Sequence, residues 1–162
     1  SNGELIGFVD ADLSSSPSAF YSLLENIGDN DGIIASRALK NSKINIKQPI
    51  SRRFVGKTFN LLVRMLLGLN FYDTQCGCKL FKKKAIKEIY NKFHITGWAF
   101  DINLLYLMKL YNFKVREIST EWNDSKESKL NVKKAIPEMF LSIIKIRFFY
   151  SRFKSLIKLF KK

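Results

Sequence analysis

The sequence is poor in the residues that build metal centres and covalent cross-links. It contains two cysteines, Cys76 and Cys78, and one histidine, His94, among 162 residues. The Cys-Gly-Cys spacing lacks the second ligand pair that a structural zinc site requires. We therefore expect two reduced thiols and a histidine with a structural role.

Long apolar runs are also absent. Arg64 interrupts the apolar stretch at 59–69, and Lys145 and Arg147 interrupt the stretch near the C-terminus. A membrane-spanning helix needs ~18 or more apolar residues, so no segment is predicted to cross a bilayer. The hydrophobic content of 46%, with 14 Phe, nevertheless argues against disorder, and the length predicts one domain with a sizeable core.

Acidic residues are half as frequent as basic ones, 14 against 28, and the net charge of +14 is unevenly spread. Residues 126–162 contain eleven Lys and Arg and two Glu, a net charge of +9. A basic amphipathic helix in this segment can lie on an anionic membrane surface, pack its apolar stripe on the core, or bind nucleic acid. Composition leaves these three roles open. The stripe is formed by Ile146, Tyr150, Phe153, Ile157 and Phe160.

Two aspartates one residue apart, Asp10 and Asp12, follow an apolar run at 5–9. The run predicts a buried strand of the parallel kind that is covered on both faces. In open α/β sheets, ligands bind beyond the carboxyl ends of strands. Paired carboxylates at that point suit a hard divalent cation that also contacts substrate phosphates, although an Asp pair can also simply form a turn.

The remaining pattern alternates strands and helices, which predicts an α/β fold. A helix is expected to begin with Ser16 as N-cap and Pro17 at its first position, and to end at Gly28. Further helices are expected at 54–67, 83–93 and 100–111, strands at 32–36 and 114–122, and loops at 40–48 and 73–79.

Several short strings resemble a known family in their identity and order. They are Asp10-Ala11-Asp12, Ala35-Ser36-Arg37, Ser51-Arg52-Arg53, Asp73-Thr74-Gln75-Cys76-Gly77-Cys78-Lys79-Leu80-Phe81, Trp98-Ala99-Phe100-Asp101 and Ser128-Lys129-Leu130. The series resembles the family 2 glycosyltransferases of GT-A fold that charge polyprenyl phosphates. It is most similar to the dolichyl-phosphate glucosyltransferase branch, and dolichyl-phosphate mannose synthases are the next neighbours.

This resemblance implies a partial GT-A (nucleotide-diphospho-sugar transferase) domain. Residues 1–130 correspond to the later part of such a domain, and residues 131–162 to basic amphipathic helices on the membrane surface. Family members begin with strands that have no counterpart in this sequence, so we expect either a fragment of a longer enzyme or a chain that something else completes.

The resemblance also assigns roles to residues. It implies that Asp10 and Asp12 hold Mg²⁺ or Mn²⁺ and that Asp101, with Asp73 and Gln75, belongs to the catalytic group. Guanidinium groups suit phosphate because their planar fork donates two parallel hydrogen bonds. The implied substrate-binding residues are Arg37, Arg52, Arg53, Thr74, Trp98, Ser128 and Lys129.

Two functions from different classes are therefore carried forward. The first is an inverting transferase that moves a hexose, glucose before mannose, from UDP-glucose or GDP-mannose to dolichyl or polyprenyl phosphate. It would work peripherally at the cytoplasmic face of a membrane, with no nucleic acid as partner. The second is a basic nucleic-acid-binding module, which charge and interleaved aromatics favour but which leaves the Asp-x-Asp motif unexplained.

Overall fold

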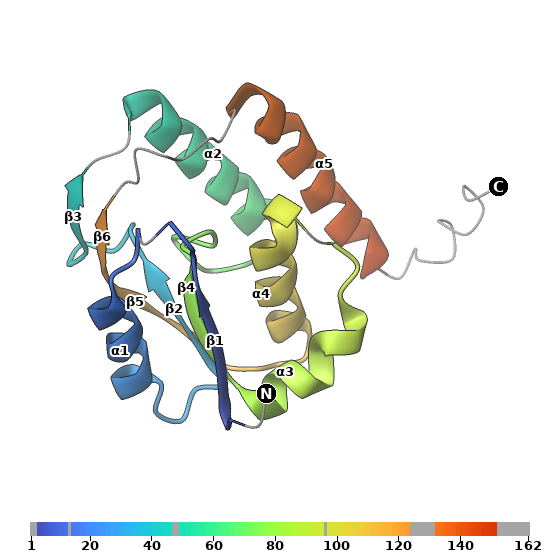
Figure 1. The fold of residues 1–162 in the computed structure, drawn as a ribbon. Coiled ribbons are helices and arrows are strands. Elements are labelled where there is room, and N and C mark those ends of the chain that lie inside the picture. Colours follow the sequence, from blue (N-terminus) through green and yellow to red (C-terminus); the bar gives the residue numbers. More distant parts are fainter. Residues whose placement is uncertain (1–2, 13, 47–48, 96, 124–131, 152–162) are drawn as a thin grey trace.

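The computed structural model describes residues 3–12, 14–46, 49–95, 97–123 and 132–151, and its central feature is a four-stranded sheet (Figure 1). The order of the strands across the sheet is β1-β4-β2-β5. Strand β4 runs antiparallel to both of its neighbours, and β2 is parallel to β5. The carboxyl ends of β1 and β2 therefore lie at the same end of the sheet as the first residue of β4. This end, where β1 and β2 terminate, is called the sheet edge below. The strands are β1 Leu5–Val9, β2 Gly32–Ser36, β4 Cys78–Lys82 and β5 Val115–Ser119.

Helices cover both faces of this sheet (Figure 1). Helix α1 (Pro17–Asn26) packs on one face, and the other face carries α2 (Ile50–Leu67), α4 (Phe100–Leu110) and α5 (Val132–Phe149). Short pieces complete the chain: α3 (Lys83–Ile89), the 3₁₀ turns Tyr90–Lys92 and Gly97–Ala99, and a small parallel sheet of β3 (Lys43–Ile46) and β6 (Glu121–Asn123).

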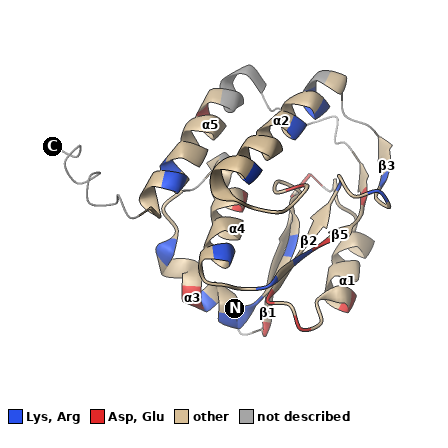
Figure 2. Cartoon of the chain, turned by 180° about the vertical axis from the view of Figure 1, so that it is seen from behind, with Lys and Arg blue, Asp and Glu red and all other residues tan. Residues whose placement is uncertain are grey.

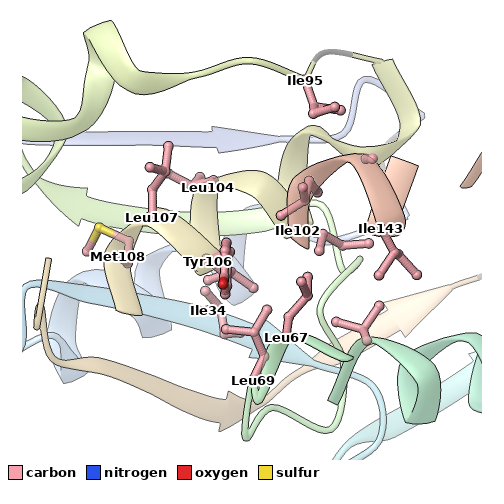
Figure 3. Packing of buried hydrophobic residues seen from close by; sticks show 14 of the residues in the cluster. Ile34, Leu67, Leu69, Ile95, Ile102, Leu104, Tyr106, Leu107, Met108 and Ile143 are labelled. Atoms are coloured by element: carbon pink, nitrogen blue, oxygen red, sulfur yellow. The ribbon is translucent and has the colours of Figure 1, made fainter. Parts of the chain in front are cut away.

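The central strands contribute to two separate cores because successive side chains of a strand point to opposite faces. In β2, Ile33 packs with α1 and Ile34 packs with the helices of the other face; in β4, Leu80 and Phe81 divide in the same way. The larger core joins α4 to α2 and α5 (Figure 3). The α/β class predicted from the sequence is confirmed.

Several local predictions agree with the structure. The bounds of the strands at 5–9 and 32–36 are as expected, and Ser16 caps α1 by accepting a hydrogen bond from the backbone N–H of Ala19 at 3.2 Å. Gly28 follows the helix with φ +46°, a left-handed conformation that glycine adopts without steric cost. Cys76 and Cys78 are buried free thiols.

Other predictions are wrong, and each error has a physical cause. Strand β1 is not a parallel strand covered on both faces. It is the outermost strand of the sheet, it pairs antiparallel with β4, and Val9 is 37% exposed. The predicted loop at 40–48 contains β3, which is held by pairing with β6, seventy-odd residues later in the chain. The predicted loop at 73–79 ends in β4, whose lysines hide the strand pattern.

Three element boundaries also differ. Helix α2 begins at Ile50 rather than 54, so Arg52 and Arg53 lie in its first turn, and α3 ends at Ile89 before a 3₁₀ turn. The predicted strand at 114–122 is divided between β5 and β6, which belong to different sheets. The predicted apolar stripe also divides, because Ile146 is fully buried and Tyr150 packs on the core; Phe153, Ile157 and Phe160 lie outside the described residues.

Candidate functional site

Charged side chains gather at the edge of the sheet where β1 and β2 end. Asp10 and Asp12 follow β1, and Arg37 follows β2. The loop 73–77 enters this edge because β4 is antiparallel: Val9 lies opposite Cys78, and the N–H of Asp10 donates to the carbonyl of Gly77 at 2.8 Å. A Cβ atom at position 77 would overlap the carboxylate of Asp10. A side chain at position 77 would therefore displace the carboxylate of Asp10 from its place in the Asp-x-Asp motif.

The carboxylate of Asp10 lies in an acidic environment. Partial burial raises its pKa, and the charges of Asp101 and Asp12 raise it further, against the opposing effects of Lys79 and Arg37. Asp12 accepts a hydrogen bond from the N–H of Ser14 at 2.9 Å through Oδ1. Two neighbouring carboxylates that repel each other form a donor set that suits a hard cation, with a diphosphate supplying further oxygens. In the described part of the chain, no group of three or more His, Cys, Asp or Glu is placed to hold a metal ion.

Arg37 and Asp73 form a two-pronged ion pair at this edge. Nε and Nη2 of Arg37 donate to the two carboxylate oxygens at 2.6 and 2.9 Å, and the N–H of Arg37 donates to Asp73 at 3.0 Å. Burial alone would raise the pKa of Asp73, but the charge and hydrogen bonds of Arg37 outweigh it and lower that pKa. Glu117 on β5 accepts from the N–H groups of Tyr72 and Asp73 at 2.9 and 2.8 Å. The guanidinium also lies over the ring of Trp122, 5.1 Å from its centroid.

A second ion pair joins β4 to α4. Nζ of Lys79 donates to Oδ1 of Asp101 at 2.7 Å and to the carbonyl of Cys76 at 2.6 Å, and Lys79 is fully buried. Asp101 lies in the first turn of α4, where the helix dipole favours a negative charge. The charge of Asp101 is also one of the causes that raise the pKa of Asp10, so the two predicted acidic residues share one electrostatic environment.

Asn60 of α2 holds the middle of the 73–77 loop by hydrogen bonds. Thr74 is buried, and its N–H and hydroxyl both lie within hydrogen-bond distance of Oδ1 of Asn60, at 3.3 and 3.0 Å. Nδ2 of Asn60 donates to the carbonyls of Phe71 and Tyr72. Gln75 is half-buried, and its N–H donates to Asp73 at 3.3 Å.

Burial raises the pKa of the Cys76 thiol to about 11 and that of the Cys78 thiol to about 12, so neither is a thiolate at neutral pH.

The other predicted residues lie on α2 and in the 3₁₀ turn before α4, or outside the described residues. Arg52 and Arg53 lie in the first turn of α2, half-buried and exposed respectively. Trp98 belongs to the 3₁₀ turn before α4, and its side chain lies outside the described part of the structure, as do Ser128 and Lys129. The sequence reasoning missed Asn60, Lys79, Glu117 and Trp122. A lysine inside a buried strand was the one available signal, and the strand itself was not recognised.

The outer helices differ in character from the sheet edge. Figure 2 shows Lys and Arg along α2, α3 and α5. On α2 the apolar side chains of Ile50, Phe54, Leu61 and Met65 are 82%, 72%, 52% and 64% exposed, and their spacing places them on one face of the helix. Within the described ranges, no helix has the length and apolar character needed to cross a bilayer.

Comparison with known proteins gives consistent matches. Residues 1–90 match the family described as Glycosyl transferase family 2. A dolichyl-phosphate beta-glucosyltransferase of Trichomonas vaginalis is 33% identical over 155 residues, which is 91% of this chain and 47% of that protein. The enzyme of the same name from Dictyostelium discoideum is 33% identical over 156 residues, covering 93% of this chain and 48% of the relative. The human protein of that name is 31% identical over 137 residues, 80% of this chain and 42% of its own length. The chain thus spans about half the length of these relatives.

Proposed function

Because this chain belongs to the family 2 glycosyltransferases, we propose that it provides the metal-binding and acceptor part of an enzyme that transfers glucose from a nucleoside-diphosphate sugar to dolichyl or polyprenyl phosphate. The observation that carries the proposal is that the 73–79 loop links the Asp-x-Asp motif to Asp101: Gly77 accepts a hydrogen bond from the N–H of Asp10, and Lys79 binds Asp101. The relatives' names support glucose rather than mannose as the sugar. The family match gives no support to the nucleic-acid-binding alternative.

The transfer is a displacement at the anomeric carbon. An oxygen of the acceptor phosphate forms the new bond to that carbon while the bond to the nucleoside diphosphate breaks, which inverts the configuration. Asp10 and Asp12 are the residues that would hold Mg²⁺ or Mn²⁺, and the bound ion would neutralise charge on the departing diphosphate. The repulsion between Asp10 and its acidic neighbours fits this role, because a cation relieves it.

Asp101 does not need to act as a strong base. A phosphate monoester has a second pKa near ~6 and is largely dianionic at neutral pH, so the acceptor arrives deprotonated. An ionised carboxylate and a dianionic phosphate both only accept hydrogen bonds, so we assign Asp101 the task of balancing an arginine that binds the acceptor phosphate, through the oxygen that Lys79 does not occupy. Gln75, half-buried on the loop beside Asp73, is assigned to the sugar or its phosphate.

Arg37 is constrained by its partner. Asp73 takes two of the five N–H donors of the guanidinium, and three remain for a phosphate at this edge. Asp73 then acts by orienting Arg37 rather than by exchanging a proton, because the pKa of Asp73 lies below the usual range.

Arg52 and Arg53, in the first turn of α2, are assigned to the acceptor phosphate as well. Replacing both with alanine should raise the KM for polyprenyl phosphate more than the KM for the nucleotide sugar.

The acceptor lipid requires that the enzyme work at a membrane surface. The exposed apolar stripe of α2 and the exposed side chains Phe140, Leu141 and Phe148 on the neighbouring α5 suit the headgroup boundary, and nearby Lys and Arg suit anionic lipid. Peripheral binding to the cytoplasmic face is the proposed location, and the two free thiols are compatible with that reducing side. Residues 131–162 remain assigned to this surface.

The test is a transfer assay with the full-length protein in liposomes that contain dolichyl phosphate. UDP-glucose should give labelled glycolipid in the presence of Mg²⁺ or Mn²⁺, whereas GDP-mannose should give much less. Asp12→Asn should reduce turnover by ~10²–10³-fold, the scale of removing one charge-stabilising group from a site, without loss of the folded state. Full activity in excess chelator, or in Asp12→Asn, would overturn the metal role; preference for GDP-mannose would overturn the glucose assignment.

A further inference from the structure

Lys79 has a fully buried ammonium group that the proposed chemistry does not itself use. Lysine is rarely buried to this extent unless it is paired, and the structure shows why it is tolerated here. Nζ donates to the carbonyl of Cys76 at 2.6 Å and to Oδ1 of Asp101 at 2.7 Å, and it lies 5.5 Å from the centroid of the Phe8 ring. The loop, strand β1 and helix α4 therefore all contact one charge.

The contacts of Lys79 fix Asp101 on one side only. The carboxylate is bound through Oδ1, and the Asp101 side chain is 24% exposed, while that of Lys79 is completely enclosed. Next to Asp101, Phe100 packs on Phe8 with ring centroids 6.0 Å apart and on Phe93 at 5.3 Å. The start of α4 is thus attached to the strand that leads to Asp10, and the acid is left with a face toward solvent.

A fixed cation holds the Asp101 carboxylate in one place. Asp101 lies in the first turn of α4, and the ammonium of Lys79 that binds it also contacts Phe8 of β1, the strand that leads to Asp10. Without this ion pair, the part-exposed Asp101 side chain would be free to turn toward water. The buried position of Lys79 prevents this, because its charge cannot be hydrated elsewhere and its stem is enclosed by the core.

We propose that Lys79 is a positioning residue for the transfer reaction: its buried ammonium holds the Asp101 carboxylate through Oδ1 at the sheet edge, so that the second oxygen of Asp101 is free to accept a hydrogen bond from an arginine that binds the acceptor phosphate. The inference rests on the proposed function. It adds a residue that acts only through Asp101 and does not touch the substrate.

A double-mutant cycle in the full-length protein tests this role. Lys79→Met should lower kcat by ~100-fold, the loss that a small misplacement of a reacting group can cause, and change the KM for the nucleotide sugar by less than ~3-fold. In an Asp101→Asn background, the same Lys79→Met change should lower kcat by less than ~3-fold, because residues that act as one unit are strongly non-additive. A purely structural lysine would cause the same fold loss in both backgrounds.

Lys109→Met is the matched control. Nζ of Lys109 also donates to two backbone carbonyls, those of Leu67 and Gly68, but it lies in the last turn of α4, at the far end from Asp101. Its replacement should leave kcat unchanged. If Lys79→Met fails to fold, Lys79→Arg replaces it in the cycle, because it keeps the charge and moves the donor.

The outcomes separate this inference from the proposed function. The wild-type transfer rate tests the function, and an inactive wild type overturns both. With an active wild type, equal losses from the Lys79 change in the two backgrounds, or full activity of Asp101→Asn, would overturn the positioning role alone. A loss that appears only when Asp101 is present supports it.

Discussion

The sheet edge and the outer face of α2 depart from the usual distribution of side chains in opposite directions. At the edge, charged groups are enclosed: Lys79 is fully buried and Asp73 nearly so. On α2, large apolar side chains are exposed, with Ile50 82% and Phe54 72% accessible. Buried charges and exposed apolar faces are both costly for an isolated protein. The comparison supports the two proposed sites, one for a charged substrate at the edge and one for an apolar surface at α2.

The largest expected effect is at the buried ion pair. Asp73→Asn removes the charge that faces Arg37 and should reduce the free energy of unfolding by ~3 kcal/mol, the lower end for breaking a buried pair, because Arg37 is 27% exposed. Denaturant unfolding of the full-length protein measures the change. The matched control is Lys43→Gln, which breaks the exposed pair with Glu121 and should cost below ~1 kcal/mol. Equal losses in the two variants would show that burial at the edge has no energetic weight.

The same pair should make the edge sensitive to acid. The pKa of Asp73 is lowered in the folded state, so its contribution is complete above the pKa of an unfolded Asp, near ~3.9. That contribution is lost as the pH falls through the lower, folded pKa. Stability should therefore decrease in strong acid in the wild type and less so in Asp73→Asn. Unfolding midpoints of both proteins, measured between about pH 2 and pH 6, test this expectation. Parallel losses of stability in the two proteins would contradict it.

A smaller effect is expected on α2, where it concerns binding rather than folding. Replacing Phe54 and Met65 with serine should weaken binding to anionic liposomes by several-fold, because their apolar area can no longer enter the headgroup boundary. The free energy of unfolding should change by less than ~0.5 kcal/mol per site, since exposed side chains contribute little to folding. Liposome co-sedimentation and denaturant unfolding report the two quantities.

Tyr21→Ser on α1 is the control for this experiment. Tyr21 is 66% exposed and lies on the helix that covers the opposite face of the sheet. It should leave liposome binding unchanged. Equal weakening by the α1 and α2 variants would remove the distinction between the two faces.

The change in stability expected at Asp10 is small, and its sign is reversed. Its pKa is raised by partial burial and by Asp101 and Asp12, so the charged form destabilises the folded state above that pKa. Asp10→Asn should raise the free energy of unfolding by less than ~1 kcal/mol, since solvent screens a part-exposed group, and should abolish transfer. Added Mn²⁺ should stabilise the wild type but not the variant. Destabilisation by Asp10→Asn in metal-free buffer would contradict the assigned repulsion.

Local sequence determined the parts of this protein that depend on neighbouring residues. The strand at 5–9 followed by Asp10 and Asp12, the Ser16 cap with Pro17, and the left-handed Gly28 could each be predicted, because strand bounds, caps and glycine conformations are set within a few positions along the chain. The pair Asp10 and Asp12 after a strand suggested a cation site by itself, whereas the role of Asp101 came from the family resemblance.

Tertiary structure decided what depends on distant pairing. Strand β3 forms only because β6 lies beside it, and β1 is an antiparallel edge strand because β4 enters between it and β2. A lysine at position 79 looks like a solvated loop residue until Asp101, 22 positions later, is placed against it by α4. Arg37 likewise finds Asp73 across 36 positions. Burial and ion pairing are properties of the assembled core, so no local pattern specifies which charge will meet which partner.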